Sequence, residues 1–160
     1  MATEQQIATV TTPSEREIRV ERVFDAPRDL VFATMTDPEL IPQWWGQHGT
    51  TTAVEVMEPR AGGLWRFHSQ DCDGNEVSFR GVYREVTAPE RIVETFEWEG
   101  MPGYVCLETG ILEDLGERTR LVSVTTFFTT EERDGMLQSG MERGMNETFE
   151  RFDALLAARR

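Results

Sequence analysis

The sequence contains no lysine, so all 16 of its basic residues are arginine. The absence of lysine excludes Schiff-base catalysis, lysine-anchored pyridoxal phosphate and the lysine of a phosphate-binding P-loop. Histidine and cysteine are scarce as well, with two residues of each, and their positions lack the spacing of zinc ligands. We therefore expect no metal and no other cofactor. Two cysteines are also too few to form a disulfide framework.

Long apolar runs are missing too. No segment approaches the roughly 18 apolar residues of a membrane-spanning helix, and residues 1–13 lack the apolar centre of a signal peptide. We therefore expect a cytoplasmic protein. The 29 acidic residues outnumber the basic ones and give a net charge of −13. Because phosphate-rich surfaces repel such a charge, neither nucleic acid nor a membrane is an expected partner.

One domain is expected over residues 15–160, after a disordered tail formed by residues 1–14. Two prolines, Pro27 and Pro38, each predict the start of a short helix. Apolar and polar residues alternate in seven segments, which predicts strands over residues 17–25, 52–57, 64–69, 77–86, 91–99, 104–112 and 120–128. Because short turns join most of these strands, they are expected to pair antiparallel in an α+β domain.

The residues after Thr129 predict one long amphipathic helix that packs against the sheet. Thr129 and Glu132 match a capping box at the start of this helix. Gly140 and Gly144 lie four residues apart on one face of it, where each glycine costs roughly 1 kcal/mol against alanine. The two glycines either hollow the helix face for a ligand or allow a strand or short helix to approach closely.

Charge is unevenly distributed along the predicted strands. Residues 85–117 contain nine acids and one arginine, Arg91. These acids are expected mainly on the outer, solvated face of the sheet, where they protect its edges from pairing with other chains. In the first strand Arg19 and Arg22 are likewise expected to face solvent, opposite Ile18 and Val20.

Six motifs follow one another along the chain: Val23-Phe24-Asp25-Ala26-Pro27, residues 40–46 ending in Trp44-Trp45-Gly46, Pro59-Arg60-Ala61-Gly62-Gly63, Phe79-Arg80-Gly81-Val82-Tyr83, Pro89-Glu90-Arg91-Ile92-Val93, and Ser139-Gly140-Met141-Glu142-Arg143-Gly144. With these motifs, residues 15–156 resemble the START-like superfamily, also called SRPBCC, helix-grip or Bet v-like. Within it, the chain is similar to the family named after the activator of heat-shock protein 90 ATPase.

The resemblance implies a helix-grip fold, in which a curved antiparallel sheet of about seven strands wraps around the long C-terminal helix. It also implies a cavity between sheet and helix that takes a small apolar or amphipathic molecule. Many relatives have tryptophan after the second glycine of the last motif, whereas this chain has Met145. A flexible thioether at this position implies a softer and roomier cavity wall.

Strand alternation places Glu94 on the same face as Phe96 and Trp98. If these aromatic side chains point into the cavity, the Glu94 carboxylate points there too. A carboxylate in that position must be paired, bound to a ligand or shifted in pKa. The alternatives are an internal ion pair, with Arg66 or Arg80, and a bulge that turns Glu94 outward.

Any acid–base chemistry in the cavity is expected to depend on Glu94, Tyr83 and His48. His48 belongs to the loop after the two short helices, which lies near the cavity mouth in a helix-grip fold. The side chains expected to line the ligand-binding cavity are Trp45, Trp65, Phe67, Phe79, Tyr83, Glu94, Phe96, Trp98, Met141, Gly144, Met145 and Phe149.

Three functions fit this sequence. The first is a protein that binds a hydrophobic or amphipathic small molecule without chemistry, since apolar walls with a few polar groups suit such a ligand. The alternative is an enzyme of the cyclase, aromatase or hydratase type, in which an enclosed cavity orients the substrate and an acid or base moves protons. A second alternative is a co-chaperone-like interaction module. Homodimers are common among relatives, but the sequence fixes no interface.

Overall fold

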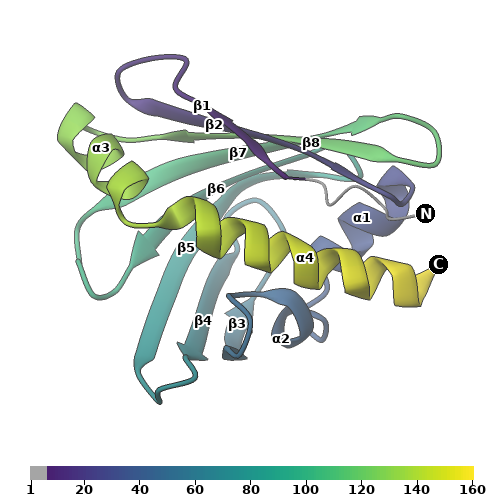
Figure 1. Cartoon of the computed structure of the whole chain (residues 1–160), viewed down its shortest axis with the longest axis horizontal. Helices are drawn as coiled ribbons and strands as arrows, with labels where there is room; N and C mark the ends of the chain where they lie inside the picture. The colour runs from purple at the N-terminus through teal and green to yellow at the C-terminus, as the bar shows by residue number, and fades with distance from the viewer. Residues whose placement is uncertain (1–6) are drawn as a thin grey trace.

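In the computed structural model, residues 7–160 form one curved antiparallel sheet wrapped around a long C-terminal helix (Figure 1). The strands are β1 (Thr9–Thr11), β2 (Glu17–Phe24), β3 (Thr51–Met57), β4 (Leu64–Gln70), β5 (Glu76–Thr87), β6 (Arg91–Trp98), β7 (Val105–Asp114) and β8 (Thr119–Thr126). The helices are α1 (Arg28–Met35), α2 (Ile41–Trp44), α3 (Thr130–Gln138) and α4 (Met141–Arg159). The predicted α+β helix-grip fold is therefore confirmed.

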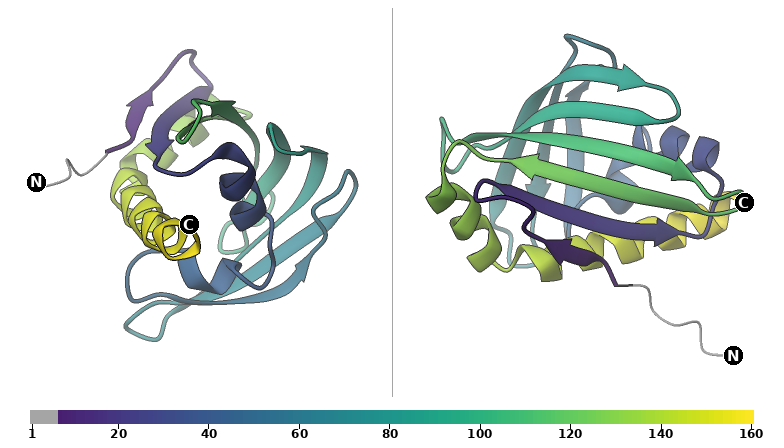
Figure 2. Two further views of the ribbon diagram at one scale, coloured as in Figure 1. Left: turned by 90° about the vertical axis from the view of Figure 1, so that its right-hand side faces the viewer. Right: turned by 90° about the horizontal axis from the view of Figure 1, so that it is seen from above.

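The eight strands lie in the order β1-β2-β8-β7-β6-β5-β4-β3, and every neighbouring pair is antiparallel. From β3 to β8 each strand pairs with the next one along the chain, because the turns between them are short. The long segment that carries α1 and α2 separates β2 from β3, so β2 pairs with β8 instead. The result is a sheet that curls around α4, as the end-on view in Figure 2 shows.

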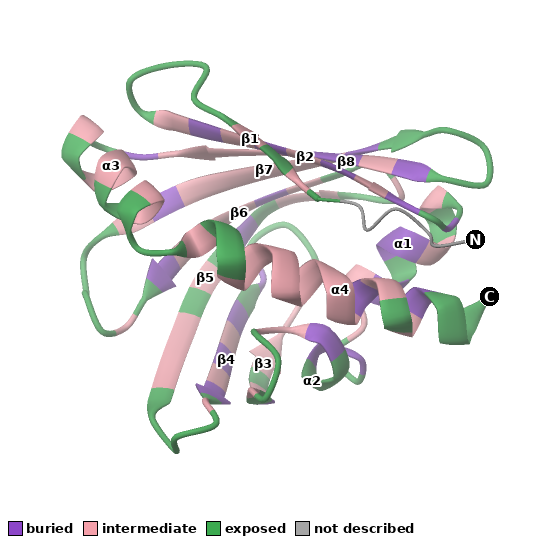
Figure 3. Cartoon of the chain, in the orientation of Figure 1, coloured by how far each residue is buried: buried purple, intermediate pink, exposed green. Residues whose placement is uncertain are grey.

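The core fills the concave side of the sheet, between the strands and the helices. Phe24 of β2 and Phe152 of α4 are both fully buried, and their ring centroids lie 5.1 Å apart in an edge-to-face contact. Trp44 of α2 packs against the same Phe152 ring, with the centroids 4.8 Å apart. Figure 3 shows buried residues along β4 and on the C-terminal half of α4. This half of the helix therefore anchors it to the sheet.

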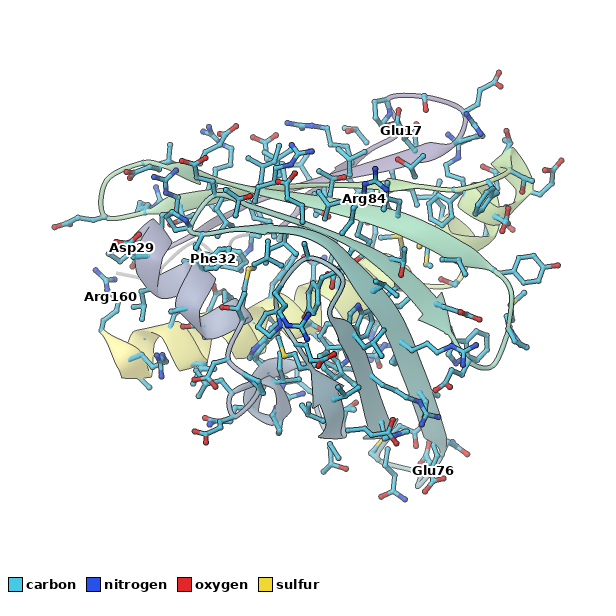
Figure 4. The ribbon with its side chains drawn as sticks, turned by 180° about the vertical axis from the view of Figure 1, so that it is seen from behind. Glu17, Asp29, Phe32, Glu76, Arg84 and Arg160 are labelled. Carbon is cyan, nitrogen blue, oxygen red and sulfur yellow. The ribbon has the colours of Figure 1, made fainter. Side chains whose placement is uncertain are left out.

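Two hydrogen bonds hold the segment that leads into α1. Thr119 of β8 is fully buried, and its hydroxyl donates to the Ala26 carbonyl over 2.7 Å, just before the helix begins. Arg160, at the end of α4, lies beside α1 (Figure 4), and its guanidinium donates to the Asp25 carbonyl over 2.8 Å. The turn that leads from β2 into α1 is thus held by both the sheet and the C-terminus.

The C-terminal segment contains two helices where the sequence pattern predicts one. Thr129 caps α3 as expected, since its hydroxyl accepts from the Glu132 backbone N–H over 3.1 Å. Gly140 then adopts a left-handed conformation, with a φ of 82°, and ends the continuity between α3 and α4. The prediction that Gly140 and Gly144 share one helix face is therefore wrong, because only Gly144 lies within a helix.

Two further predictions about the N-terminal region are wrong. Thr9–Thr11, within the expected disordered tail, form β1 and pair with β2, which brings the sheet to eight strands; residues 1–6 of that tail lie outside the described residues. Arg22 is buried rather than solvent-facing, with a side chain only 2% exposed. Arg22 shares the concave face with Ile18, Val20 and Phe24, which are every second residue of β2. The strand alternation, and not the charge, therefore determines where its side chain points.

The outer face of the sheet carries a network of ion pairs. Arg66 of β4 binds Glu55 and Glu99, at 2.9 Å and 3.0 Å. Arg80 of β5 binds Glu97 of β6 at 3.2 Å. These arginines therefore lie on the side of the sheet away from α4. In the described part of the chain, no helix is long and apolar enough to cross a membrane.

Candidate functional site

A cavity of about 500 Å³ lies between the N-terminal half of α4 and the strands β4, β5 and β6. The loop after α2 forms its third wall. The cavity is lined by Trp45, Gly46, Gln47, Thr50, Ser69, Asp71, Val77, Phe79, Phe96, Met141, Gly144, Met145, Thr148 and Phe149. It is therefore built from segments that are far apart in the sequence and that meet only in the folded protein.

Aromatic rings and methionines make up most of the apolar wall. The Phe79 and Phe96 centroids lie 5.4 Å apart across β5 and β6, and Trp45 lies 6.3 Å from Phe79. Opposite them, Met141 and Met145 project from α4. Unbranched thioether side chains adapt their shape to what they contact. One wall is thus rigid and aromatic, and the other is deformable.

The loop wall is held in place by α4. The Arg151 guanidinium donates to the carbonyls of Trp45 and Gly46, over 3.0 Å and 3.2 Å. Partial burial lowers the pKa of this guanidinium from its usual value. His48, a candidate base in the sequence, has a half-exposed side chain and contacts Glu150 of α4 at 2.8 Å. His48 therefore helps to fasten the loop from outside and does not reach into the cavity.

Gly144 of α4 lines the cavity and faces the loop after α2. A Cβ atom on Gly144 would lie 2.8 Å from the nitrogen at the end of the Gln47 side chain, which would have to move aside. The neighbour of this glycine is thus a loop side chain rather than a strand or a short helix.

Two carboxylates are cross-strand neighbours on the concave side of the sheet, and both have intermediate exposure. Glu94 of β6 is the direct cross-strand partner of Glu108 of β7, and Tyr83 of β5 is its partner on the other side. Directly opposite residues of antiparallel strands share one face, with Cβ atoms about 5 Å apart. Phe96, two residues after Glu94, shares that face and lines the cavity. The Glu94–Glu108 pair therefore lies beside the aromatic wall on the same concave face, next to the residues that line the cavity.

Burial strongly perturbs this pair. Desolvation raises the pKa of Glu94 well above its usual value of 4.5, and the nearby Glu108 charge raises it further. Desolvation raises the pKa of Glu108 to about 7. Burial also raises the pKa of the Tyr83 phenol, with a smaller contribution from Glu94. Because desolvation and like charges at this separation oppose ionisation, both carboxyls favour the protonated form more than a solvated glutamate does.

The ion pair with Arg66 or Arg80, the sequence alternative for Glu94, does not form. Both arginines bind other acids on the outer face. Among residues 7–160, no salt bridge or side-chain hydrogen bond involves Glu94 or Glu108. The bulge alternative does not apply either, because the register shift of β5 lies beyond the Tyr83–Glu94 pair.

The structure separates the predicted lining residues into three groups. Trp45, Phe79, Phe96, Met141, Gly144, Met145 and Phe149 line the cavity. Trp65 and Phe67 are packed in the core, with 2% and 3% of their surface exposed, and Tyr83 and Glu94 are cross-strand neighbours on the concave face outside the cavity lining. Trp98 is 41% exposed and is not among the residues that line the cavity. It ends β6 beside the Gly100 turn, where the sheet no longer encloses the side chain.

Sequence reasoning missed Glu108 and Arg151. Glu108 shares its strand face with Cys106 and Leu112, both buried, so alternation along β7 was a usable signal. Because Glu108 belongs to the acidic segment of residues 85–117, it was expected on the outer face of the sheet. Arg151 gave no such signal, because its partners are backbone carbonyls of a distant loop. Only the folded structure brings them together.

The fold agrees with the comparisons to known proteins. The sequence model of the family described as "Activator of Hsp90 ATPase homolog 1-like protein" matches residues 25–157. The chain belongs to this family. The resemblance inferred from the six motifs is therefore confirmed. No relative was found among the curated proteins.

Solved structures of relatives have the same architecture. A protein from Rhodobacter sphaeroides is 26% identical, with a TM-score of 0.88 over 95% of this chain and 99% of its own. A protein from Arthrobacter aurescens is 28% identical, with a TM-score of 0.85 over 94% and 91% of the two chains. The AHSA1 protein from Silicibacter pomeroyi, at 23% identity and a TM-score of 0.75 over 90% and 99%, supports the fold alone. Family membership of this kind does not assign a function.

Proposed function

We propose that this protein binds a small apolar or amphipathic molecule in the cavity between α4 and strands β4–β6. The observation that carries the proposal is the cavity itself, which has about 500 Å³ of space and walls formed by Phe79, Phe96, Met141, Met145 and Phe149. Ligand sites in proteins typically occupy roughly 300–1,000 Å³ and are mostly apolar with a few polar groups. Burying an apolar ligand against these walls is favourable, at roughly 25 cal/mol per Å².

The cavity lining also contains polar residues. Gln47 and Thr50 come from the loop after α2, and Asp71 comes from the turn after β4. Polar groups together with an aromatic wall suit an amphipathic molecule. The loop fastened by Arg151 forms one side of the cavity.

The test is a cavity-filling variant. Met145→Trp adds bulk to the helix wall of the cavity, so it should weaken binding of the neutral probe 2-(1-naphthyl)ethanol by at least about tenfold. Isothermal titration calorimetry measures the affinity. Met101→Trp is the matched control, since Met101 is 48% exposed and lies outside the cavity lining. Equal affinities of wild type and Met145→Trp, or no binding to the wild type, would contradict the proposal.

Proton transfer to a bound molecule is the second candidate function, and the Glu94–Glu108 pair favours it. A carboxyl group kept protonated near neutral pH is suited to act as a general acid. Once a substrate is identified, Glu94→Gln should abolish turnover and leave the fold intact by circular dichroism. Unchanged turnover in this variant would exclude the acid role. A co-chaperone role is supported by the family name alone and is not proposed.

A further inference from the structure

The carboxyl pair on the concave face has no cation of its own. The strand register of the described residues places one basic side chain on that face, Arg22 of β2. Its guanidinium donates to the Asp153 carboxylate over 3.0 Å and stacks above the Phe24 ring at 4.9 Å. Arg22 is therefore already neutralised by Asp153, and Glu94 and Glu108 remain without a positive partner.

The other side chains around the pair add no positive charge. The titratable groups facing it are Tyr83 on β5 and Cys106 on β7, and Glu132 of α3 acts electrostatically on Cys106. The neighbouring positions on β8 are Ser123 and Thr125, which are uncharged, and α4 contributes Met145 and Phe149. The electrostatic environment inside the sheet is thus negative and favours a cation.

A second feature points to a ligand at the same place. Tyr83 is only 4% exposed, and its hydroxyl has no hydrogen-bond partner within residues 7–160. Its cross-strand position beside Glu94 directs it to the same concave face. Buried polar groups are normally satisfied by a protein group, a water or a ligand. The hydroxyl oxygen itself is not fully buried, so Tyr83 supplies an unused and accessible hydrogen-bonding group beside two unused carboxyls.

The walls next to the pair suit an organic cation. Phe79, Phe96 and Trp45 form an aromatic cluster close to the pair, and aromatic faces attract ammonium groups. A metal ion is less suited, because no group of three or more potential metal ligands occurs among residues 7–160. A cavity of about 500 Å³ also has room for an apolar skeleton attached to the charged group.

We propose that the ligand of this cavity carries a protonated amine, which forms ion pairs with Glu94 and Glu108 and a hydrogen bond with Tyr83. The proposal rests on the proposed function and adds the chemical class of the ligand. Because burial raises the pKa of both carboxyls, pairing with the amine favours their charged forms, and binding near neutral pH releases protons to solvent. The apolar part of the ligand then lies between the aromatic wall and the methionines of α4.

The test compares two probes with one skeleton, 2-(1-naphthyl)ethylamine and 2-(1-naphthyl)ethanol. A primary amine such as the lysine side chain is protonated below about pH 10, so the first probe is a cation. At pH 8 the amine should bind wild type about tenfold or more tightly than the alcohol. This ratio should fall below pH 7, by up to about tenfold per pH unit, because the amine must then displace a proton.

The double variant Glu94→Gln/Glu108→Gln should reduce the amine-to-alcohol affinity ratio to about one. The charge-matched control is Glu85→Gln/Glu113→Gln, which removes two acids that bind Arg91 and Arg120 outside the cavity. The control should keep the wild-type ratio. Calorimetry of the wild type in two buffers of different ionisation enthalpy adds a readout that needs no variant, and it should show proton release with the amine only.

The outcomes separate the two proposals. Binding of both probes to wild type with equal affinity would overturn the amine proposal and leave the proposed function standing. Binding of neither probe would overturn both. Tighter amine binding that persists in the Glu94→Gln/Glu108→Gln variant, or binding without proton release at pH 7, would also refute the role of the carboxyl pair.

Discussion

Replacing Glu108 with glutamine should make the protein more stable, and only at neutral or alkaline pH. Glu108 and Glu94 lie directly opposite each other on a concave face where neither has a positive partner among the described residues. Glutamine has nearly the shape of a protonated glutamic acid but cannot ionise. When the Glu108 carboxyl becomes charged, the folded protein loses stability. The variant cannot ionise at this position, so it avoids that loss.

The size of the effect follows from linkage. The Glu108 pKa is about 7 in the folded protein, against a usual value of 4.5. The folded state then binds more protons than the unfolded state between these two values, so stability falls as pH rises through that range. Each pKa unit corresponds to about 1.36 kcal/mol, which gives ~3 kcal/mol lost above pH 7. At pH 4.5 and below, both states hold the proton and the loss disappears.

Urea denaturation followed by circular dichroism, from pH 4.5 to pH 8.5, measures this effect. Glu108→Gln should gain about 2–3 kcal/mol over wild type at pH 8 and less than about 0.5 kcal/mol at pH 4.5. The matched control on the same strand is Glu113→Gln, whose carboxylate is exposed and bound to Arg120 at 2.9 Å. This control should lose up to about 1 kcal/mol at pH 8. A difference between Glu108→Gln and wild type that does not depend on pH would refute the reasoning.

The remaining predictions concern stability and use the same denaturation assay. Asp153→Ala should cost about 2–3 kcal/mol, because it leaves the buried Arg22 guanidinium unpaired; a loss below about 0.5 kcal/mol would contradict this. Phe152→Ala should cost about 3–5 kcal/mol, since its fully buried ring would leave a cavity. Gly81→Ala should cost about 1–3 kcal/mol and shift the tryptophan emission, because the new Cβ would clash with the Thr95 carbonyl oxygen and with the Trp65 ring. Wild-type stability and emission in Gly81→Ala would contradict this clash.

Much of the fold could be predicted from local sequence signals. Alternation along the strands, prolines before the short helices and the Thr129 cap are properties of short segments, and the structure confirms them. β1 was missed because three residues, Thr9–Thr11, carry too little pattern to distinguish a strand from a tail. The break at Gly140 was missed because a single glycine inside an amphipathic pattern is compatible with a continuous helix.

Residues of the candidate site could be predicted only where the alternation along a strand determines which face of the sheet a side chain lies on. Alternation identified Glu94, and the same rule applied to Cys106 and Leu112 would have identified Glu108. Arg22 shows the limit of charge as a guide, since its ion pair with Asp153 of α4 depends on the folded arrangement. His48 could not be placed from the sequence, because only the structure brings the loop beside α4.

The most direct test of the central claim is a ¹³C-methyl NMR titration of the seven methionines with 2-(1-naphthyl)ethylamine. The naphthyl ring current should shift the methyl signals of Met141 and Met145, which line the cavity, and saturate at one ligand per chain. The signals of Met35 and Met101, which lie outside the cavity lining, should stay in place. Shifts confined to Met101, or no shift of Met141 and Met145 at saturating probe, would contradict a ligand in this cavity.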